Sequence, residues 1–331
     1  MDDPAATAGA ELALRISLAV VVLVLSGLPP AAGGEVTPTA IASPSVDLPG
    51  YQLAWSDEFD GESLDGSRWT VRTGARRDAI NSADAISVSG GVLTITTFTS
   101  GGTHFTGFID TAGKVEPTFG FLEARIRFGP SPGEWSAFWL QSPTYGTPIG
   151  DPAVAGAEID IAEHRAVNAT GIDISAQFSS AVHWDGYGDD HKSVTSGLTP
   201  TPPGPSLSGT WHVYGLLWTA SGYSVFLDGR LLWATSSGVS QRGELIRLTS
   251  EVQDAAWAGT IPAEGYGSID ESATRMDVDW VRVWQQPPVV AIGDASASEG
   301  ADGTTTLVLT VTLATPGGEA GAAGAARGSE P

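Results

Sequence analysis

The stretch Ala157-Glu158-Ile159-Asp160-Ile161-Ala162-Glu163-His164 carries three carboxylates within six residues, interleaved with isoleucine. Successive side chains of a β-strand point to opposite faces, so a strand here would present Glu158 and Asp160 on one face and both isoleucines on the other. Strict alternation would turn Glu163 away, but a single-residue β-bulge near Ala162 would return it, because a bulge sets two residues opposite one on the partner strand. We therefore predict a strand with a row of acids on one face and an apolar face toward the core.

The acids suit the chemistry of a retaining glycosidase. In such an enzyme two carboxylates approach to roughly 5–5.5 Å; one attacks the anomeric carbon, and the other first donates and then removes a proton. Glu158 and Glu163 are the candidates, and Asp160 between them adds like charge, which raises at least one carboxyl pKa. Two other interpretations stay open on these residues alone: a divalent-metal site that uses the same carboxylates with His164, and an acidic stripe on a solvated strand.

The composition limits the classes of molecule that the chain is expected to bind. The chain has 331 residues, a net charge of −22 and only two lysines, Lys114 and Lys192. This acidic balance speaks against nucleic acid or an anionic membrane, and against a heavily sulphated polysaccharide unless arginines cluster locally. The 11 tryptophans against 6 tyrosines suit sugar rings, on which indoles stack. We expect a monomer whose partner is a polysaccharide.

The first 33 residues are expected to be a signal peptide. An apolar run over residues 12–28 is followed by prolines and small residues suited to cleavage, although the segment before it is acidic. The alternative is an uncleaved membrane anchor. We expect a secreted, extracellular protein that leaves the membrane after cleavage and, having no cysteine, has no disulfide. Residues 34–50 are expected to be a linker, because they are rich in Pro, Ser, Thr and Ala.

From Tyr51 onward, short apolar segments alternate with Gly, Asp, Ser and Pro, a spacing typical of an all-β sandwich. The clearest element is a hairpin in which Asp228-Gly229 supplies the positive φ angles of a type I′ turn. No long helix is predicted, and residues 196–210, with four prolines, are expected to form a surface loop. The other expected strands are residues 92–96, 121–128, 135–140, 176–184 and 276–284.

Two of these strands can be phased against the acids. If Phe138 and Leu140 enter the core, Trp135 and Trp139 lie on the acidic face, where an indole offers a flat surface to a pyranose and an N–H to a hydroxyl. The alternative is that the indoles fill the core.

The strand at residues 176–184 is treated in the same way. Core positions for Phe178 and Val182 turn His183 toward the acids, where it could hydrogen-bond a sugar or the acid/base carboxylate. A structural histidine near a strand end is the alternative. Trp184 is a further candidate for substrate binding.

These residues resemble glycoside hydrolase family 16, in the β-bulge branch that includes the bacterial laminarinases. The resemblance begins at Ala54-Trp55-Ser56-Asp57-Glu58-Phe59-Asp60-Gly61 and ends at Val278-Asp279-Trp280-Val281-Arg282-Val283. Further motifs match in order at residues 119–125, 133–139 and 211–214. The pattern Glu-Ile-Asp-Ile-x-Glu downstream of the paired tryptophans is the most specific of them. Residues 51–286 are therefore expected to be the catalytic domain.

The resemblance implies an all-β fold, namely a concanavalin-like β-jelly roll of two curved antiparallel sheets with a concave substrate cleft. It implies Glu158 as the nucleophile, Glu163 as the general acid/base and Asp160 as the residue that couples them, with no cofactor for catalysis. Trp135 and Trp139 resemble the tryptophans that flank the cleaved bond.

Family members often hold a structural calcium ion far from the chemistry. The resemblance implies Asp279 as its side-chain ligand, Gly91 as a carbonyl ligand and Glu58 as a third candidate. Oxygen ligands of this kind suit a hard cation. The alternative is that Asp279 is an ordinary acid at a strand edge.

Departures from the family pattern affect the substrate. Ser136 stands where glucan-cleaving relatives commonly have proline, and His164-Arg165 after the last acid is unusual for them. Residues 74–84 and 145–154 are expected to form loops near the cleft. The leading expectation is an endo-acting β-1,3-glucanase of the laminarin type.

The alternatives are a β-galactan hydrolase of the agar or carrageenan type, a transglycosylase of the same fold, and a non-catalytic carbohydrate-binding jelly roll. An anionic galactan would need several basic side chains to converge on the cleft. The candidates are Arg72, Arg76, Arg77, Arg165 and Lys192.

Residues 287–331 are expected to hold a linker and an incomplete Calx-β-like segment. Residues 289–300 and 304–313 resemble the first strands of that module. Two strands do not form an independent sandwich, so residues 314–331 are expected to be disordered.

Overall fold

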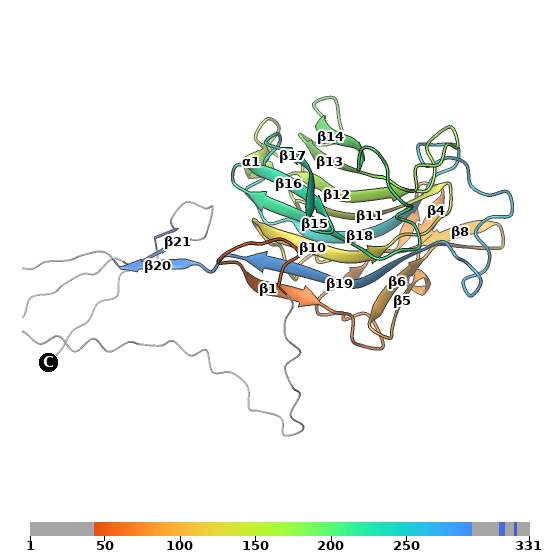
Figure 1. Cartoon of the computed structure of the whole chain (residues 1–331), viewed down its shortest axis with the longest axis horizontal. Helices are drawn as coiled ribbons and strands as arrows, with labels where there is room; N and C mark the ends of the chain where they lie inside the picture. Colours follow the sequence, from red (N-terminus) through yellow and green to blue (C-terminus); the bar gives the residue numbers. More distant parts are fainter. Residues whose placement is uncertain (1–42, 293–310, 315–320, 323–331) are drawn as a thin grey trace, which may run out of the picture. The chain divides into compact units, whose positions relative to one another are not determined.

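The computed structural model describes residues 43–292, 311–314 and 321–322 (Figure 1). The expected signal peptide lies outside the described residues. Within the described part, no helix has the length and hydropathy needed to span a membrane. The only helical elements there are α1 (Pro152–Ala155) and the 3₁₀ turn η1 (Ala83–Ala85).

Two curved antiparallel sheets are stacked face to face, which confirms the predicted all-β sandwich (Figure 1). The first sheet runs, in spatial order, β17 (Arg230–Thr235), β16 (Gly222–Leu227), β15 (His212–Thr219), β10 (Gly120–Arg127), β19 (Arg275–Gln285), β6 (Val92–Thr96) and β5 (Ile86–Ser89), with β1 (Gln52–Asp57) also paired to β19. The second runs β14 (Lys192–Thr199), β13 (Phe178–Trp184), β12 (Glu158–Arg165), β11 (Glu134–Gln141), β18 (Leu245–Val252), β9 (Phe108–Asp110) and β2 (Thr70–Val71).

The space between the sheets is filled by the side chains that alternation assigns to one face of each strand. Leu122 and Ile126 of β10 are fully buried there, as are Phe138 and Leu140 of β11. Removing a side chain of this size from water contributes about 1.5–3 kcal/mol. The other face of the second sheet is thereby left to carry the polar side chains of β11 and β12.

The hairpin between β16 and β17 has the predicted turn. Asp228 and Gly229 have φ angles of 49° and 76°, as a type I′ turn requires. A small additional sheet holds β3 (Gly74–Arg76), β4 (Ala79–Asn81), β8 (Thr103–Thr106) and β7 (Phe98–Ser100).

Strand β12 contains the predicted bulge. Phe138 of β11 is paired with Ala162, but the next residue, Trp139, is paired with Asp160, so Ile161 has no partner of its own. Ile161 and Ala162 are both fully buried in the core. The extra residue therefore returns Glu163 to the face that carries the other acids.

At the C-terminal end, β20 (Val289–Ile292) pairs with β21 (Val311–Ala314), which pairs with β22 (Gly321–Ala322). Ala314, Gly321 and Ala322 thus take part in strand pairing, and the expected disorder of residues 314–331 stays a prediction. Backbone pairing to β21 gives these few residues a regular conformation. A Calx-β module is not established by these short strands.

Candidate active site

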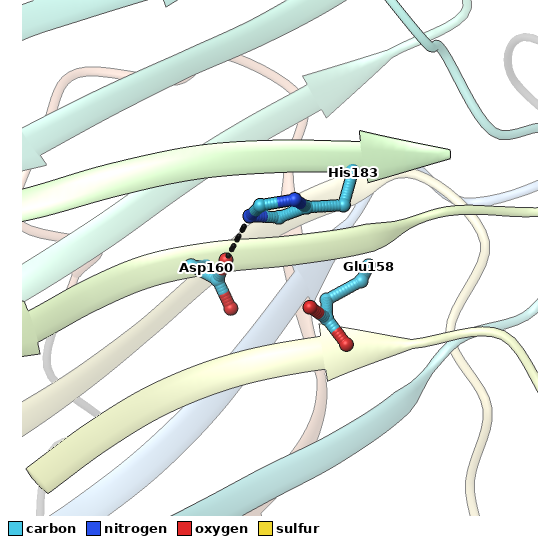
Figure 2. Close-up of side chains that lie close together, drawn as sticks. All are labelled: Glu158, Asp160 and His183. Carbon is cyan, nitrogen blue, oxygen red and sulfur yellow. Dashed lines mark ion pairs between the residues drawn. The ribbon is translucent and has the colours of Figure 1, made fainter. Parts of the chain in front are cut away.

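The register of the second sheet puts all three acids on one face, which we call the acid face. Glu158 lies opposite Gln141 of β11 and His183 of β13, and Asp160 lies opposite Trp139. Paired residues of an antiparallel ladder point to the same side of the sheet. One ligand-type atom from each of Glu158, Asp160 and His183 lies within 4.8 Å of the others (Figure 2).

His183 joins the acids from the neighbouring strand. Its Nε2 lies 3.2 Å from Asp160 Oδ2, and Figure 2 shows the imidazole reaching from β13 toward β12. The side chains of His183 and Asp160 are 25% and 8% exposed, so the contact is shielded from water on the Asp160 side. The prediction that His183 faces the acids is confirmed.

Burial and mutual repulsion favour protonated carboxyls in this cluster. Burial raises the pKa of Asp160 well above its usual value, and the charges of Glu158 and Glu251 raise it further. Burial also raises the pKa of Glu163, with an added contribution from Asp160, while His183 and Arg165 oppose the shift. A carboxyl that keeps its proton near neutral pH can act as a general acid.

Glu158 is held differently, by hydrogen-bond donors. Gln141 Nε2 donates to Glu158 Oε2 over 2.5 Å, and the Tyr187 hydroxyl donates to the same oxygen. The amide of Gln141 is oriented by Arg247, whose guanidinium donates to Gln141 Oε1 over 2.6 Å. These donors and the Arg247 contact fix the orientation of the Glu158 carboxylate on the acid face.

Trp135 and Trp139 lie on the acid face, as predicted, but arginines cover them. Arg77 lies 5.0 Å above the ring of Trp135, and Arg247 lies 4.7 Å from the ring of Trp139. The two residues are only 4% and 5% exposed. Direct stacking of a sugar on either indole stays a prediction, since the guanidinium groups occupy that side of the rings.

The predictions made for Trp184 and for His164 need correction. Trp184 belongs to the opposite face: it packs against the main core, where a Cβ at Gly238 would lie 2.5 Å from its ring. His164 also points inward and is stacked on Phe128 with ring centroids 4.9 Å apart. Alternation puts both side chains between the sheets, so Trp184 does not line the acid face and a metal site using His164 is excluded.

Arginines reach the acid face from several elements. Arg76 and Arg77, in the hairpin of residues 74–84, both pair with Glu251 of β18. Arg72 forms two hydrogen bonds with Asp110, at 2.8 and 3.0 Å. The segment 74–84, expected to be a loop, thus contains the hairpin of β3 and β4, which supplies guanidinium groups to the acid face.

A second group of basic side chains is more dispersed. Arg165 lies 3.7 Å from the Trp257 ring, which itself contacts Trp135 edge-on. Lys192 instead pairs with Asp185 over 2.6 Å. Of the five basic residues named from the sequence, the four arginines thus lie beside acid-face residues or their aromatic neighbours. Lys192 is instead paired with Asp185.

The predicted calcium ligands do not fit a calcium site as their side chains lie. Both carboxylate oxygens of Glu58 accept hydrogen bonds from Arg282, at 2.9 and 2.8 Å. Asp279 accepts from Arg125 over 2.6 Å. The predicted ligands are Asp279, Glu58 and the Gly91 carbonyl. Guanidinium groups already neutralise the two carboxylates, and a cation would have to displace them.

Sequence reasoning missed several contacts of the site. Gln141 lies two residues beyond Trp139, so extending the same alternation would have found it. Arg247 follows from no local pattern, because its position depends on the pairing of β18 with β11. Tyr187 and His191 lie in the loop between β13 and β14, where no periodicity applies.

The curved antiparallel sandwich and the Glu-x-Asp-x-x-Glu row on its bulged strand are features that the resemblance to glycoside hydrolase family 16 implies. The family described as "Beta-porphyranase A-D, GH16 domain" matches residues 51–286, and the chain belongs to this family. The broader prediction of family 16 is therefore confirmed, whereas the finer laminarinase-like assignment is not established.

Known relatives include enzymes named for several polysaccharides. The chain is 22% identical to glucan endo-1,3-beta-glucosidase A1 of Niallia circulans, over 72% of this chain and 38% of that protein. It is 23% identical to keratan-sulfate endo-1,4-beta-galactosidase of Sphingobacterium multivorum, over 78% of this chain and 61% of the relative. It is 26% identical to beta-porphyranase E of Zobellia galactanivorans, over 71% and 88%. The chain thus spans well under half of the first of these relatives.

Solved structures show the same fold. Porphyranase B of Zobellia galactanivorans superposes with a TM-score of 0.59 at 23% identity, covering 73% of this chain and 97% of that one. The endo-beta-1,3-glucanase of Pyrococcus furiosus superposes with a TM-score of 0.56 at 23% identity, covering 71% and 94%. At these identities the comparison supports the sandwich architecture alone.

Proposed function

We propose that this chain is an endo-acting, retaining glycoside hydrolase that cleaves a sulphated β-galactan outside the cell. The observation that carries the choice of polysaccharide is the set of arginines on the acid face. Five of them lie beside its side chains: Arg72 and Arg247 pair with Asp110, Arg76 and Arg77 pair with Glu251, and Arg165 lies against the Trp257 ring.

The proposed reaction is a double displacement. Glu158 attacks the anomeric carbon while Glu163 gives its proton to the departing glycosidic oxygen, so that a covalent glycosyl ester forms and the sugar on the leaving side departs. Glu163 then removes a proton from water, whose oxygen attacks the same carbon and releases Glu158. The donors on Glu158 orient the attacking carboxylate, and the raised pKa of Glu163 keeps on that residue the proton that the first step transfers.

Sulphate esters suit the arginines because a guanidinium donates two parallel hydrogen bonds to an oxyanion. The side chains of Arg72, Arg76 and Arg77 keep 44%, 39% and 42% of their surface exposed while their partner carboxylates are buried. Their remaining N–H groups can therefore face a ligand without giving up the ion pairs that hold them. A neutral glucan would offer no group that uses this charge.

The named relatives leave two substrate classes in contention. One relative is named a keratan-sulfate endo-1,4-beta-galactosidase and another a beta-porphyranase, whereas the Niallia circulans enzyme is named a glucan endo-1,3-beta-glucosidase. The β-1,3-glucan activity expected from the sequence is thus the second candidate. The arginines favour the galactan.

The test is a panel of porphyran, keratan sulphate, agarose, carrageenan, laminarin and mixed-linkage glucan, with products separated by chromatography. We expect the enzyme to release oligosaccharides from a sulphated galactan and fewer from its desulphated form. We expect no product longer than the donor, because a hydrolase, unlike a transglycosylase, transfers the sugar to water. Laminarin as the preferred substrate, or equal rates with and without sulphate, would refute the proposal.

Paired variants test the arginines directly. Arg76→Ala with Arg77→Ala should lower kcat/KM on the sulphated polymer by about tenfold or more, since a hydrogen bond to a charged group contributes about 1.5–3 kcal/mol. The desulphated polymer should be cleaved at nearly the unchanged rate. Arg230→Ala, which removes an exposed arginine of β17, is the matched control.

A further inference from the structure

The loop between β13 and β14 is fixed at both ends. Asp185, which is 1% exposed, accepts a hydrogen bond from Lys192 over 2.6 Å and from the backbone N–H of Gly150 over 2.7 Å. A Cβ at Gly146 would lie 2.6 Å from the Cα of Gly186, so the neighbouring loop packs closely against this one. The loop is therefore a built part of the molecule, and its side chains have defined positions.

His191 of this loop continues a chain of contacts that leads from solvent to the acids. Its Nε2 lies 3.0 Å from His183 Nδ1, and His183 Nε2 lies 3.2 Å from Asp160 Oδ2. The two imidazoles are nearly parallel, with an interplanar angle of 10°. Exposure falls along the chain, from the exposed His191 to the buried Asp160.

This arrangement couples the tautomer of His183 to its neighbour. A neutral imidazole has one N–H and one acceptor nitrogen, and the partner of one nitrogen decides which is which. If His191 donates to Nδ1 of His183, the proton of His183 must lie on Nε2, where it is directed at Asp160 (Figure 2). Without a partner at Nδ1, water can take either role and both tautomers become accessible.

We propose that His191 is a positioning residue of the active site, which fixes His183 in the tautomer that donates from Nε2 to Asp160. The hydrogen bond from His183 then orients the Asp160 carboxyl between Glu158 and Glu163. The inference rests on the proposed roles of these acids and not on the choice of polysaccharide.

Other charged and titratable groups surround this chain of contacts. From β12, Glu158, Asp160 and Glu163 face His183. From the loop, the Tyr187 ring lies 6.3 Å from that of His191, and the Asp185–Lys192 pair closes the loop. Among the described residues, none of these groups contacts Nδ1 of His183, whose hydrogen-bond partner is His191.

The first experiment compares His191→Ala and His191→Gln with wild type on a polysaccharide that the wild type cleaves. His191→Ala should lower kcat about three- to tenfold, the worth of one hydrogen bond, with KM within about twofold. His191→Gln should restore kcat, because its amide can donate to Nδ1 of His183. Asp189→Asn, on the same exposed loop, is the matched control and should leave both constants unchanged.

The second experiment reads the tautomer itself. The chain has only five histidines, so long-range ¹H–¹⁵N NMR of the imidazoles can be assigned by substitution. We expect a single Nε2–H tautomer for His183 in wild type and in His191→Gln, and a mixture in His191→Ala. Thermal melts of all variants check that they fold.

The outcomes separate the two proposals. A wild type that cleaves none of the polysaccharides overturns the proposed function, while the NMR comparison still tests the tautomer. If the wild type cleaves one of them, a His191→Ala variant with the wild-type kcat, or one with an unchanged His183 spectrum, overturns the role of His191. An Nδ1–H tautomer of His183 in the wild type would also overturn it.

Discussion

Replacing Glu244 with Gln should remove a pH dependence of folding that originates next to the start of β12. Glu244 is fully buried, its Oε1 accepts a hydrogen bond from the backbone N–H of Ala157 over 3.1 Å, and its Oε2 has no partner among the described residues. Burial raises its pKa from 4.5 to about 8, although Ser240 and the Ala157 N–H oppose the shift. The carboxyl is therefore held protonated in the folded chain at neutral pH.

The sign of the effect follows from the raised pKa. A group that binds its proton more tightly when folded stabilises the protein fully below its unfolded pKa, and this stabilisation is lost as the pH rises through the folded pKa. The pKa of Glu244 rises from 4.5 to about 8 on folding, a difference of about 3.5. One pKa unit corresponds to about 1.4 kcal/mol, so the contribution to the free energy of unfolding is at most about 5 kcal/mol. The free energy of unfolding should fall by a few kcal/mol across this range in wild type.

Glu244→Gln keeps an oxygen for the Ala157 N–H and has no proton to lose, so its stability should be nearly flat over the same range. Urea unfolding at pH 5 to 9 measures both proteins, and the exposed Glu264→Gln is the matched control. Glu134, whose pKa burial raises to about 7, titrates in both proteins and cancels in the comparison. A wild type whose stability falls no faster with pH than that of the variant would refute the reasoning.

Three further outcomes are expected. His164, whose pKa burial lowers to about 4, should destabilise the fold by up to about 3 kcal/mol as the pH falls from 6.5 to 4, and urea unfolding should show that His164→Gln loses this acid sensitivity. Tyr187→Phe removes a donor to Glu158 and should lower kcat about tenfold in steady-state assays, whereas an unchanged kcat would show that Gln141 suffices. Millimolar EDTA should leave the melting temperature unchanged, because arginines neutralise the carboxylates proposed for calcium; a drop of several degrees would restore the calcium prediction.

The fold and the central acids could be predicted because they depend on local periodicity. Alternation with a period of two assigns Trp139 and His183 to the acid face, and one inserted residue near Ala162 is enough to bring Glu163 back to it. The same alternation, applied without exception, also places Trp184 and His164 in the core. Trp184 has the same phase in the strand as the buried Phe178 and Val182, and this phase places it against the core.

The remaining contacts depend on chain segments far apart in sequence. Tyr187 reaches Glu158 only because the Asp185–Lys192 pair and the packing of Gly146 on Gly186 fix its loop. Such placement follows from tertiary packing, for which the sequence has no periodic signal. Loops of this kind commonly carry the residues that complete a site on a rigid sheet.

The acid face also shows how the charge near a site can differ from the net charge of the whole chain. Asp110 and Glu251 are 1% and 6% exposed, and each holds more than one guanidinium group, so each buried carboxylate leaves an excess of positive charge at the surface beside it. Charges elsewhere on the chain act on a ligand through water and salt, which screen them over about 8–10 Å. A sulphate at this face would therefore respond to the nearby arginines far more than to the net charge of −22. Buried acids that anchor several arginines thus allow a strongly acidic protein to present a local site for an anion.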